Sequence, residues 1–334
     1  MARVYTAADI EDLARGGAKR LVVAKGELIS PAAVDLAASR AIELIRGGEE
    51  PGGPSPGSSQ NRITHTTMAS KIHWFLAFLC LLAAGCRQRA GYPAGKWIDL
   101  SYDLSGQTIS WPTSEPFQLD TVAAGRTEKG YYYSAFKFCA SEHGGTHIDA
   151  PIHFAQGRKT VDQIPLSQLI APAVKIDVSR KVRENRDYQI RVSDLEAWEK
   201  AHGPIPDGSI VLFYTGFGQY WPDPLKYLGT DLRGTAGVAA LHFPGLSPAA
   251  AAWLVANRRI KAVGIDTASI DYGQSQTYGS HVALMQLDIP AFENVASLEQ
   301  VPATGAQVIA LPLKIKGGSG GPLRIIAFIP ESAR

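Results

Sequence analysis

Short apolar runs separated by turn-forming residues fill the chain between residues 97 and 329. Runs of this kind, rich in β-branched and aromatic side chains, predict strands, whereas two longer segments predict helices over residues 192–201 and 247–257. The second helix has a clear start, because Ser247 can cap it and Pro248 fits its first turn. The predicted strands cover residues 109–111, 131–138, 173–176, 210–214, 262–265, 308–313 and 323–328. Many strands with few helices predict an α/β fold with a large mixed sheet.

The first 46 residues have a pattern of their own, which predicts a small α/β unit of unknown role. A helix over residues 7–15 is followed by a short strand over 21–23, and Ser30-Pro31 starts a second helix over 32–45. This unit is similar to short N-terminal extensions of some bacterial metabolic and microcompartment-associated enzymes. It contains no histidine and no group of residues that suggests chemistry.

A stretch rich in Gly, Pro and Ser follows, so residues 47–67 are predicted to be a flexible linker. Residues 72–84 then form an apolar run that is shorter than the roughly 20 residues needed to span a bilayer but matches a signal-peptide core. The segment 68–86 ends in LAAGC, which resembles a bacterial lipobox and predicts a lipid on Cys86, with a buried core helix as the alternative. If translation starts at Met68, we expect a lipid-anchored protein of the bacterial cell envelope, on its periplasmic or extracellular face; otherwise we expect a cytoplasmic protein.

Composition narrows the classes of function. Hydrophobic residues make up 45% of the chain, charged residues 19%, and the formal net charge is +2, which gives no electrostatic footprint for nucleic acid. The three cysteines, Cys80, Cys86 and Cys139, form no CxxC pair, so neither a disulfide framework nor a cysteine zinc site is available. Any metal ion must therefore be held by histidine and carboxylate.

Three of the eight histidines lie with an aspartate inside residues 143–153. Imidazole and carboxylate form the ligand set that zinc and manganese prefer. His147 and Asp149 are two residues apart, so on an extended segment they face the same side and can share one ion. The run therefore predicts a metal site on a strand.

Glycine and proline inside the run let the two other histidines reach the same place. Gly144-Gly145 can bend the chain and bring the ring of His143 back toward the site. Pro151 enforces a further turn, which can aim His153 at the site as well.

The run reads H-x-G-T-H-x-D-x-P-x-H from His143 to His153, and every position of this pattern is filled. It resembles the signature of the metal-dependent cyclase family, which includes bacterial kynurenine formamidases and related amide and lactam hydrolases. The likeness extends over residues 97–329 and implies a hydrolase domain at 97–330 with the family's cyclase-like swivelling β/β/α fold. Matching segments also occur at Asp99-Leu100-Ser101, Trp111-Pro112, residues 264–267, residues 269–271, His281 and residues 293–295.

The resemblance also implies a site for two divalent ions, zinc or manganese. The implied ligands are His143, His147 and Asp149 for one ion, with Asp149, His281 and Glu293 for the other. His153 would be the catalytic acid and base, and Trp111 would contact the substrate. A structural metal site remains the alternative for the cluster, and simple packing remains the alternative for Trp111.

The implied reaction is hydrolysis of an amide C–N bond through a metal-activated water. An arylformamide such as N-formylkynurenine is the default small-molecule substrate. The alternatives are a hydrolase of lactams or cyclic imides such as isatin, and a non-catalytic metal- or ligand-binding lipoprotein. Members of the family are usually homodimers or homotetramers, so we expect a homo-oligomer.

Four remaining features are predicted to be structural. Tyr131–Tyr133 are expected to pack within a strand, and Cys139 is expected to be a buried thiol. Gly317–Gly321 lacks the Lys-Ser/Thr of a phosphate-binding loop and is predicted to be the loop before the last strand. His242 is as readily a loop histidine as a pocket residue.

Overall fold

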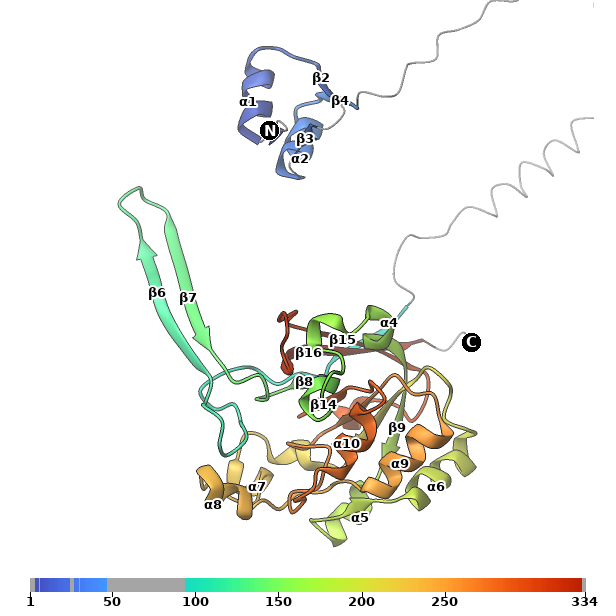
Figure 1. Cartoon of the computed structure of the whole chain (residues 1–334). Helices are drawn as coiled ribbons and strands as arrows, with labels where there is room; N and C mark the ends of the chain where they lie inside the picture. Colours follow the sequence, from blue (N-terminus) through green and yellow to red (C-terminus); the bar gives the residue numbers. More distant parts are fainter. Residues whose placement is uncertain (1–3, 6, 25–26, 30, 47–93, 332–334) are drawn as a thin grey trace, which may run out of the picture. The chain divides into compact units, whose positions relative to one another are not determined.

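The computed structural model describes residues 4–5, 7–24, 27–29, 31–46 and 94–331 (Figure 1). The predicted linker and the lipobox-like segment with Cys86 lie outside these residues. The chain divides into two units, residues 1–88 and 89–334. None of the described helices has the length and hydrophobicity that a membrane span requires.

The described residues of the first unit form two successive β-α-β arrangements. Its elements are β1 (Val4–Tyr5), α1 (Ala7–Arg15), β2 (Arg20–Val23), β3 (Leu28–Ile29), α2 (Pro31–Ser39) and β4 (Glu43–Arg46). β1 pairs in parallel with β3, and β2 pairs in parallel with β4. Ile10, Ala33 and Ala37 are fully buried in the small core of this unit. The helix predicted over residues 7–15 is confirmed.

The helix predicted over residues 32–45 is wrong in its C-terminal part. α2 ends at Ser39, and Ala41 has a φ of 53°, in the left-handed region that stops a helix. Leu44 then pairs with Leu21 of β2, so that residues 43–46 form β4. This long-range pairing outweighs the local helical propensity.

The described part of the second unit is built on a barrel of seven strands, and an eighth strand lies outside it. The barrel order is β15 (Ala306–Pro312), β9 (Ile170–Asp177), β11 (Ile210–Tyr214), β13 (Ala262–Ile265), β14 (Ala291–Glu293), β8 (His147–Asp149) and β16 (Gly320–Pro330). β16 pairs with β15 and thereby closes the barrel, while β5 (Gly95–Asp99) pairs with the end of β16. β9, β11, β13 and β14 run parallel, and the other barrel pairings are antiparallel. The predicted α/β fold with a large mixed sheet is confirmed.

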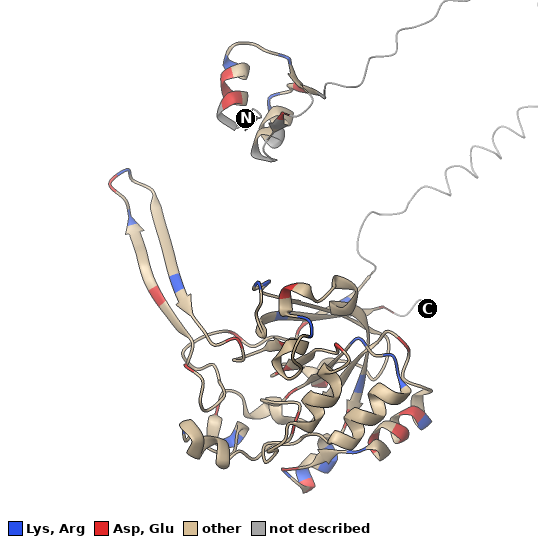
Figure 2. Cartoon of the chain, viewed as in Figure 1, with Lys and Arg blue, Asp and Glu red and all other residues tan. Residues whose placement is uncertain are grey.

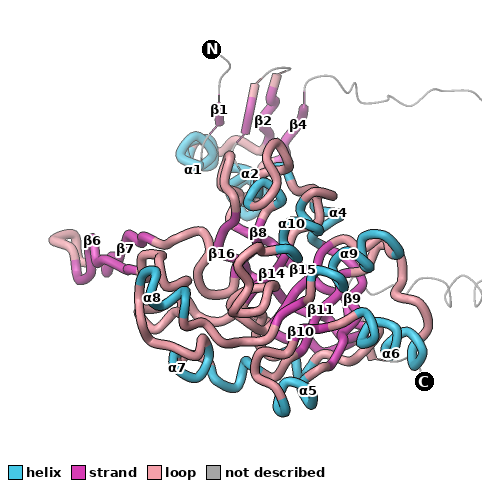
Figure 3. Tube along the Cα trace, turned by 60° about the horizontal axis from the view of Figure 1, so that its bottom comes forward, coloured by secondary structure: helices cyan, strands magenta, loops and turns pink. Residues whose placement is uncertain are grey.

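The central barrel strands are buried on both faces. Ile210 and Leu212 belong to the core inside the barrel, whereas Val211 and Phe213 belong to a second core outside it. The outer core is covered by α6 (Val192–His202), α9 (Pro248–Asn257) and α10 (Gly279–Met285), which lie along one side of the strands (Figure 3). Burial on both faces explains why these strands read as continuous apolar runs. The strands predicted over residues 210–214 and 262–265 have the predicted bounds.

Shorter elements connect the barrel strands. They are α4 (Leu166–Leu169), α5 (Ser179–Glu184), β10 (Gln189–Ile190), α7 (Pro224–Tyr227), α8 (Gly234–Ala239) and β12 (Gly245–Leu246). One predicted strand is absent from the described residues, because residues 109–111 form only an isolated bridge between Ser110 and Gly144. Pro112 has no N–H to continue a ladder, and Ser114 N donates to Trp111 O in a turn.

An antiparallel hairpin of β6 (Gln118–Arg126) and β7 (Tyr132–Cys139) projects from the barrel (Figure 1) and is called the arm below. Figure 2 shows that the arm carries few charged residues. Tyr131, Tyr132 and Tyr133 are 56%, 68% and 53% exposed, and Cys139 is also exposed. The predictions of packed tyrosines and a buried thiol are therefore wrong. A strand that leaves the body of its own chain cannot bury its side chains there.

Candidate metal centre

Strand β8 places the central part of the histidine run in the barrel wall, between β14 and β16. His147 and Asp149 are both buried, and the extended backbone directs their side chains to the same side. In the pairing of β8 with β14, Glu293 lies opposite His147. His281 comes from α10. The barrel thus brings together residues that are more than a hundred positions apart in sequence.

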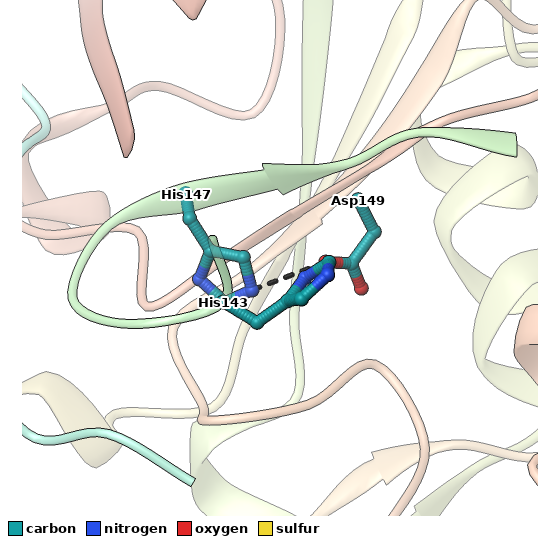
Figure 4. Close-up of side chains that lie close together, drawn as sticks. All are labelled: His143, His147 and Asp149. Carbon is teal, nitrogen blue, oxygen red and sulfur yellow. Dashed lines mark hydrogen bonds and ion pairs between the residues drawn. The ribbon is translucent and has the colours of Figure 1, made fainter. Parts of the chain in front are cut away.

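His143 lies in the loop before β8 and turns back toward Asp149, as the sequence predicts (Figure 4). Its Nδ1 is 2.6 Å from Asp149 Oδ1, and His147 Nε2 is 3.1 Å from the same oxygen. The bend is made at Gly145, which has a φ of +61° and no room for a Cβ beside Leu104. These three side chains could hold one metal ion.

A second group of ligand atoms lies on the other side of Asp149. His281 Nε2 is 3.0 Å from Asp149 Oδ2 and 3.2 Å from Glu293 Oε1, and all three residues are buried. This triad could also hold a metal ion. Asp149 therefore offers one oxygen to each group of ligand atoms.

One buried atom tests whether a cation fits the site. His147 Nε2 lies 3.1 Å from Asp149 Oδ1 and 3.5 Å from Glu293 Oε2, yet it makes no aligned hydrogen bond. A buried polar atom without a hydrogen bond is costly unless another partner satisfies it. A cation between these groups would do so, and three imidazoles with two carboxylates suit zinc or manganese. The residues therefore fit a divalent metal.

Each imidazole of the cluster is oriented by a second partner behind it. His147 Nδ1 donates to Gly145 O at 2.9 Å, and this carbonyl also accepts from Asn294 Nδ2 at 2.7 Å. His281 Nδ1 donates to Asp271 Oδ2 at 2.6 Å. Such partners fix the tautomer and direct the other ring nitrogen to the metal. Neither Asp271 nor Asn294 is a predicted site residue, although both lie in segments that match the family.

The charges of the cluster hold protons on His147 and His281 when no metal competes. Burial disfavours the charged form of His147, but Asp149 and Glu293 outweigh it and raise its pKa to about 9. Burial likewise opposes protonation of His281, whose hydrogen bonds to Asp149, Asp271 and Glu293 still raise its pKa well above the ordinary value. Burial also opposes ionisation of Asp149, and the surrounding imidazoles nevertheless hold its pKa well below the usual range. Metal and protons therefore compete for the same atoms.

This competition predicts a pH dependence of metal affinity. Because the pKa of His147 is raised to about 9, the residue is protonated at neutral pH and must lose a proton to bind a metal. We expect the apparent affinity for Zn²⁺ or Mn²⁺ to rise by about tenfold per pH unit for each displaced proton between pH 6 and 9. Chelator-competition titrations of the full chain across this range measure it. An affinity that does not change with pH would contradict the protonated cluster.

His153 and Trp111 lie at a cavity of about 300 Å³ that opens onto the cluster. His153 belongs to a short 3-10 helix over Pro151–His153, and its ring stacks on His143 with centroids 3.9 Å apart. Burial, together with the charges of neighbouring histidines, lowers the pKa of His153 to about 4. Its imidazole is therefore neutral at pH 7. Phe154, Tyr278 and Ser110 complete the walls near these residues.

The predicted site residues that the structure describes all line this cavity. They are His143, His147, Asp149, His281, Glu293, His153 and Trp111. His242 lies elsewhere, where its Nδ1 is 2.8 Å from Asp187 Oδ2. Asp187 and His242 do not line the cavity. The roles of the seven residues as ligands, catalyst and substrate contact remain predictions.

Known proteins share this architecture. The family model described as putative cyclase matches residues 98–272. An isatin hydrolase of Roseibium aggregatum is 32% identical over 199 residues, which cover 57% of this chain and 73% of that protein. A kynurenine formamidase of Salinibacter ruber is 29% identical over 233 residues, covering 69% of this chain and 95% of that protein. The solved structure of isatin hydrolase A from Ralstonia solanacearum has a TM-score of 0.64 at 32% identity and covers 80% of this chain and 100% of that chain.

The fold and the site define the chain as a metal-dependent hydrolase of amide C–N bonds. It belongs to the cyclase family. The family, the fold class and the class of enzyme predicted from the sequence are therefore confirmed.

Proposed function

We propose that the chain hydrolyses a small aromatic amide, with an arylformamide such as N-formylkynurenine as the default substrate. The observation that carries this proposal is the position of Asp149, which is shared by two groups of metal-ligating atoms at one cavity. The neutral His153 and the aromatic Trp111 line the same cavity. Both kinds of relative, the kynurenine formamidase and the isatin hydrolases, are in accord with cleavage of an amide bond beside an aromatic ring.

The proposed centre holds two ions, zinc or manganese. The ligands would be His143, His147 and Asp149 for one, with Asp149, His281 and Glu293 for the other. A bound divalent cation supplies an activated water and polarises the carbonyl group that is attacked. The carboxylates of Asp149 and Glu293 would offset part of the charge of such ions in a buried site.

The residues around the cavity would bind the substrate and move the proton. His153 is neutral at pH 7 because of its low pKa, so a ring nitrogen can accept a proton and pass it to the leaving amine nitrogen. Trp111 and Phe154 offer aromatic surface to the ring of the substrate.

A lactam or cyclic imide such as isatin is the second candidate substrate. Two observations favour it: isatin hydrolases are among the relatives, and no lysine or arginine is present among the described residues that line the cavity. The zwitterionic head of N-formylkynurenine would thus meet no lysine or arginine from these residues, whereas isatin carries no such head. A fixed positive charge is the usual protein partner of a substrate carboxylate.

A metal-resolved activity screen tests the proposed function. The full chain is freed of metal, reloaded with zinc or manganese, and assayed against N-formylkynurenine, formanilide and isatin. We expect metal-dependent release of formate from a formamide, or ring opening of isatin. No turnover of any of these compounds by the metal-loaded protein would favour the non-catalytic, metal- or ligand-binding alternative.

We further propose that the chain is a homodimer or homotetramer in which the arm packs against a second copy. The arm has one apolar face, because Leu119 on β6 lies opposite Phe138 on β7, with Phe136 and Tyr132 at alternate positions beyond it. All four side chains are more than half exposed. An isolated two-stranded hairpin is marginally stable in water, and an exposed apolar patch of this kind is typical of an interaction surface.

Substitutions on the two faces of the arm test this assembly. Replacing both Tyr132 and Phe136 with serine should convert the oligomer into single chains, measured by size-exclusion chromatography with light scattering. Tyr133→Ser is the matched control, because Tyr133 lies on the opposite face of the same strand. A double variant with the same mass as the wild-type protein would show that the arm is not the interface.

The location of the protein is proposed from its sequence. We propose that Cys86 carries a lipid and anchors the chain in the bacterial envelope if translation starts at Met68; otherwise the chain is cytoplasmic. Support comes from the LAAGC sequence and the apolar run before it. Intact-mass analysis of protein from the membrane fraction should find a lipidated N-terminal Cys86. An unmodified chain that begins at Met1 in the cytosol would disprove the anchor.

A further inference from the structure

The glycine-rich segment Gly317–Gly321 lies directly against His143, one of the candidate metal ligands. A Cβ added to Gly320 would be 2.6 Å from Cε1 of His143, and a Cβ added to Gly318 would be 2.6 Å from Oε1 of Glu142. Gly320 has no room for a side chain, because a Cβ there would also lie 2.5 Å from the carbonyl oxygen of Ile148. At Gly318 the carboxylate of Glu142 would have to move. Residues 317–319 form the predicted loop, but the prediction is wrong for Gly320 and Gly321, which belong to β16. The segment lies close against the ring of a candidate ligand.

Ser319, at the centre of this segment, connects His143 to Glu142. Its Oγ lies 3.0 Å from His143 Nε2 and donates to Glu142 Oε2 at 2.6 Å. Its backbone N–H donates to the same carboxylate oxygen at 3.0 Å. Its carbonyl accepts from Ala150 N at 2.8 Å, which ties the segment to the end of β8. Ser319 is thus held from both sides while it faces the imidazole.

His143 needs such support more than the other candidate histidine ligands do. Its side chain is 22% exposed and comes from a loop, whereas the side chains of His147 and His281 are 2% and 3% exposed. The ring of His281 is held by Asp271, and that of His147 by the carbonyl of Gly145. For His143, Ser319 is the only hydrogen-bond partner of the ring other than Asp149 among the described residues.

We propose that Ser319 and Glu142 are positioning residues that hold His143 for one of the two metal ions. Ser319 accepts the Nε2–H of His143 and leaves Nδ1 directed at Asp149, while Glu142 fixes the hydroxyl of Ser319. Partners of this kind orient a ligand, and their loss weakens metal binding by about 10- to 100-fold. This inference rests on the proposed metal centre. On this proposal, binding of one ion depends on the glycine-rich segment, whereas binding of the other does not.

Separate affinities of the two ions in the full chain test the proposal. We expect Ser319→Ala to weaken one of the two Zn²⁺ sites by about 10- to 100-fold and to leave the other within twofold. Ser209→Ala is the matched control, because Ser209 is a buried serine that donates to Pro206 O away from the cluster. Cobalt-loaded protein gives a second readout, in which the absorption spectrum of the affected site alone should change.

A pair of variants at Glu142 keeps the test decisive if Ser319→Ala does not fold. Glu142→Gln retains an oxygen that can accept from Ser319 and should bind both ions nearly as tightly as the wild-type protein. Glu142→Ala removes the acceptor and should lose affinity at one site, as Ser319→Ala does. Wild-type affinity at both sites in Ser319→Ala or Glu142→Ala would overturn the proposal. A wild-type protein that binds no metal would instead refute the proposed function.

Discussion

Replacing Asp149 with alanine is expected to remove both metal ions and to lower kcat/KM by about a thousandfold or more. Among the described residues, Asp149 alone offers an oxygen to each group of ligand atoms, at 2.6 Å from His143 Nδ1 and 3.0 Å from His281 Nε2. A metal ion is worth several kcal/mol of transition-state stabilisation, and about 1.4 kcal/mol corresponds to a tenfold change in rate. Losing both ions should therefore remove nearly all turnover.

Metal content per chain and kcat/KM are measured together in this variant. Asp207→Ala is a suitable control, because Asp207 is an exposed aspartate that pairs with Arg259 at 3.0 Å and has no contact with the cluster. The control should keep both ions and full activity. An Asp149→Ala protein that retains two ions, or more than a tenth of the wild-type activity, would refute the shared carboxylate.

Replacing His153 with alanine is expected to lower kcat by about 10²- to 10⁴-fold while both ions remain bound, which is the usual effect of losing a general acid or base. The ring stacks on His143 but makes no ion pair with Asp149 or Glu293. Its low pKa of about 4 leaves it neutral and ready to carry a proton. Activity should therefore fall without loss of metal.

Two substrates that differ in their leaving group test the role of His153 more specifically. If His153 delivers the proton to the leaving amine, the variant should lose far less activity on p-nitroformanilide than on formanilide, because nitroaniline leaves without full protonation. His242→Ala serves as the control, because His242 pairs with Asp187 outside the cavity. An equal loss on both substrates, or a loss of metal in place of turnover, would contradict the assigned role.

Local sequence patterns predicted the features that depend on residues close together in the sequence. The strands over residues 210–214 and 262–265 are buried on both faces, so every residue must be apolar and the bounds are visible in the sequence. The spacing of His147 and Asp149 required an extended segment, and β8 provides it. A bend at Gly144-Gly145 was predicted because His143 has to return to the same ion, and Gly145 has the left-handed φ of +61° that makes it.

Features that depend on distant pairing could not be predicted in the same way. β8 and β14 have three residues each, and they form because neighbouring strands offer them hydrogen bonds. Ser319 and His143 are 176 positions apart in the sequence, and no rule of residue spacing predicts their contact. The tyrosines of the arm read as core residues because an apolar strand looks the same whether it packs on its own chain or lies exposed. His281 and Glu293 were predicted as metal ligands from the family resemblance alone.

We propose that one histidine–carboxylate cluster, with Asp149 shared, is a two-ion centre for amide hydrolysis. The most direct measurement is an activity titration, in which metal-free full-length protein receives zinc or manganese while arylformamide or isatin hydrolysis is followed. We predict no turnover without metal and full activity at two ions per chain. Turnover by the metal-free protein, or saturation of both sites without turnover of either substrate, would contradict the account.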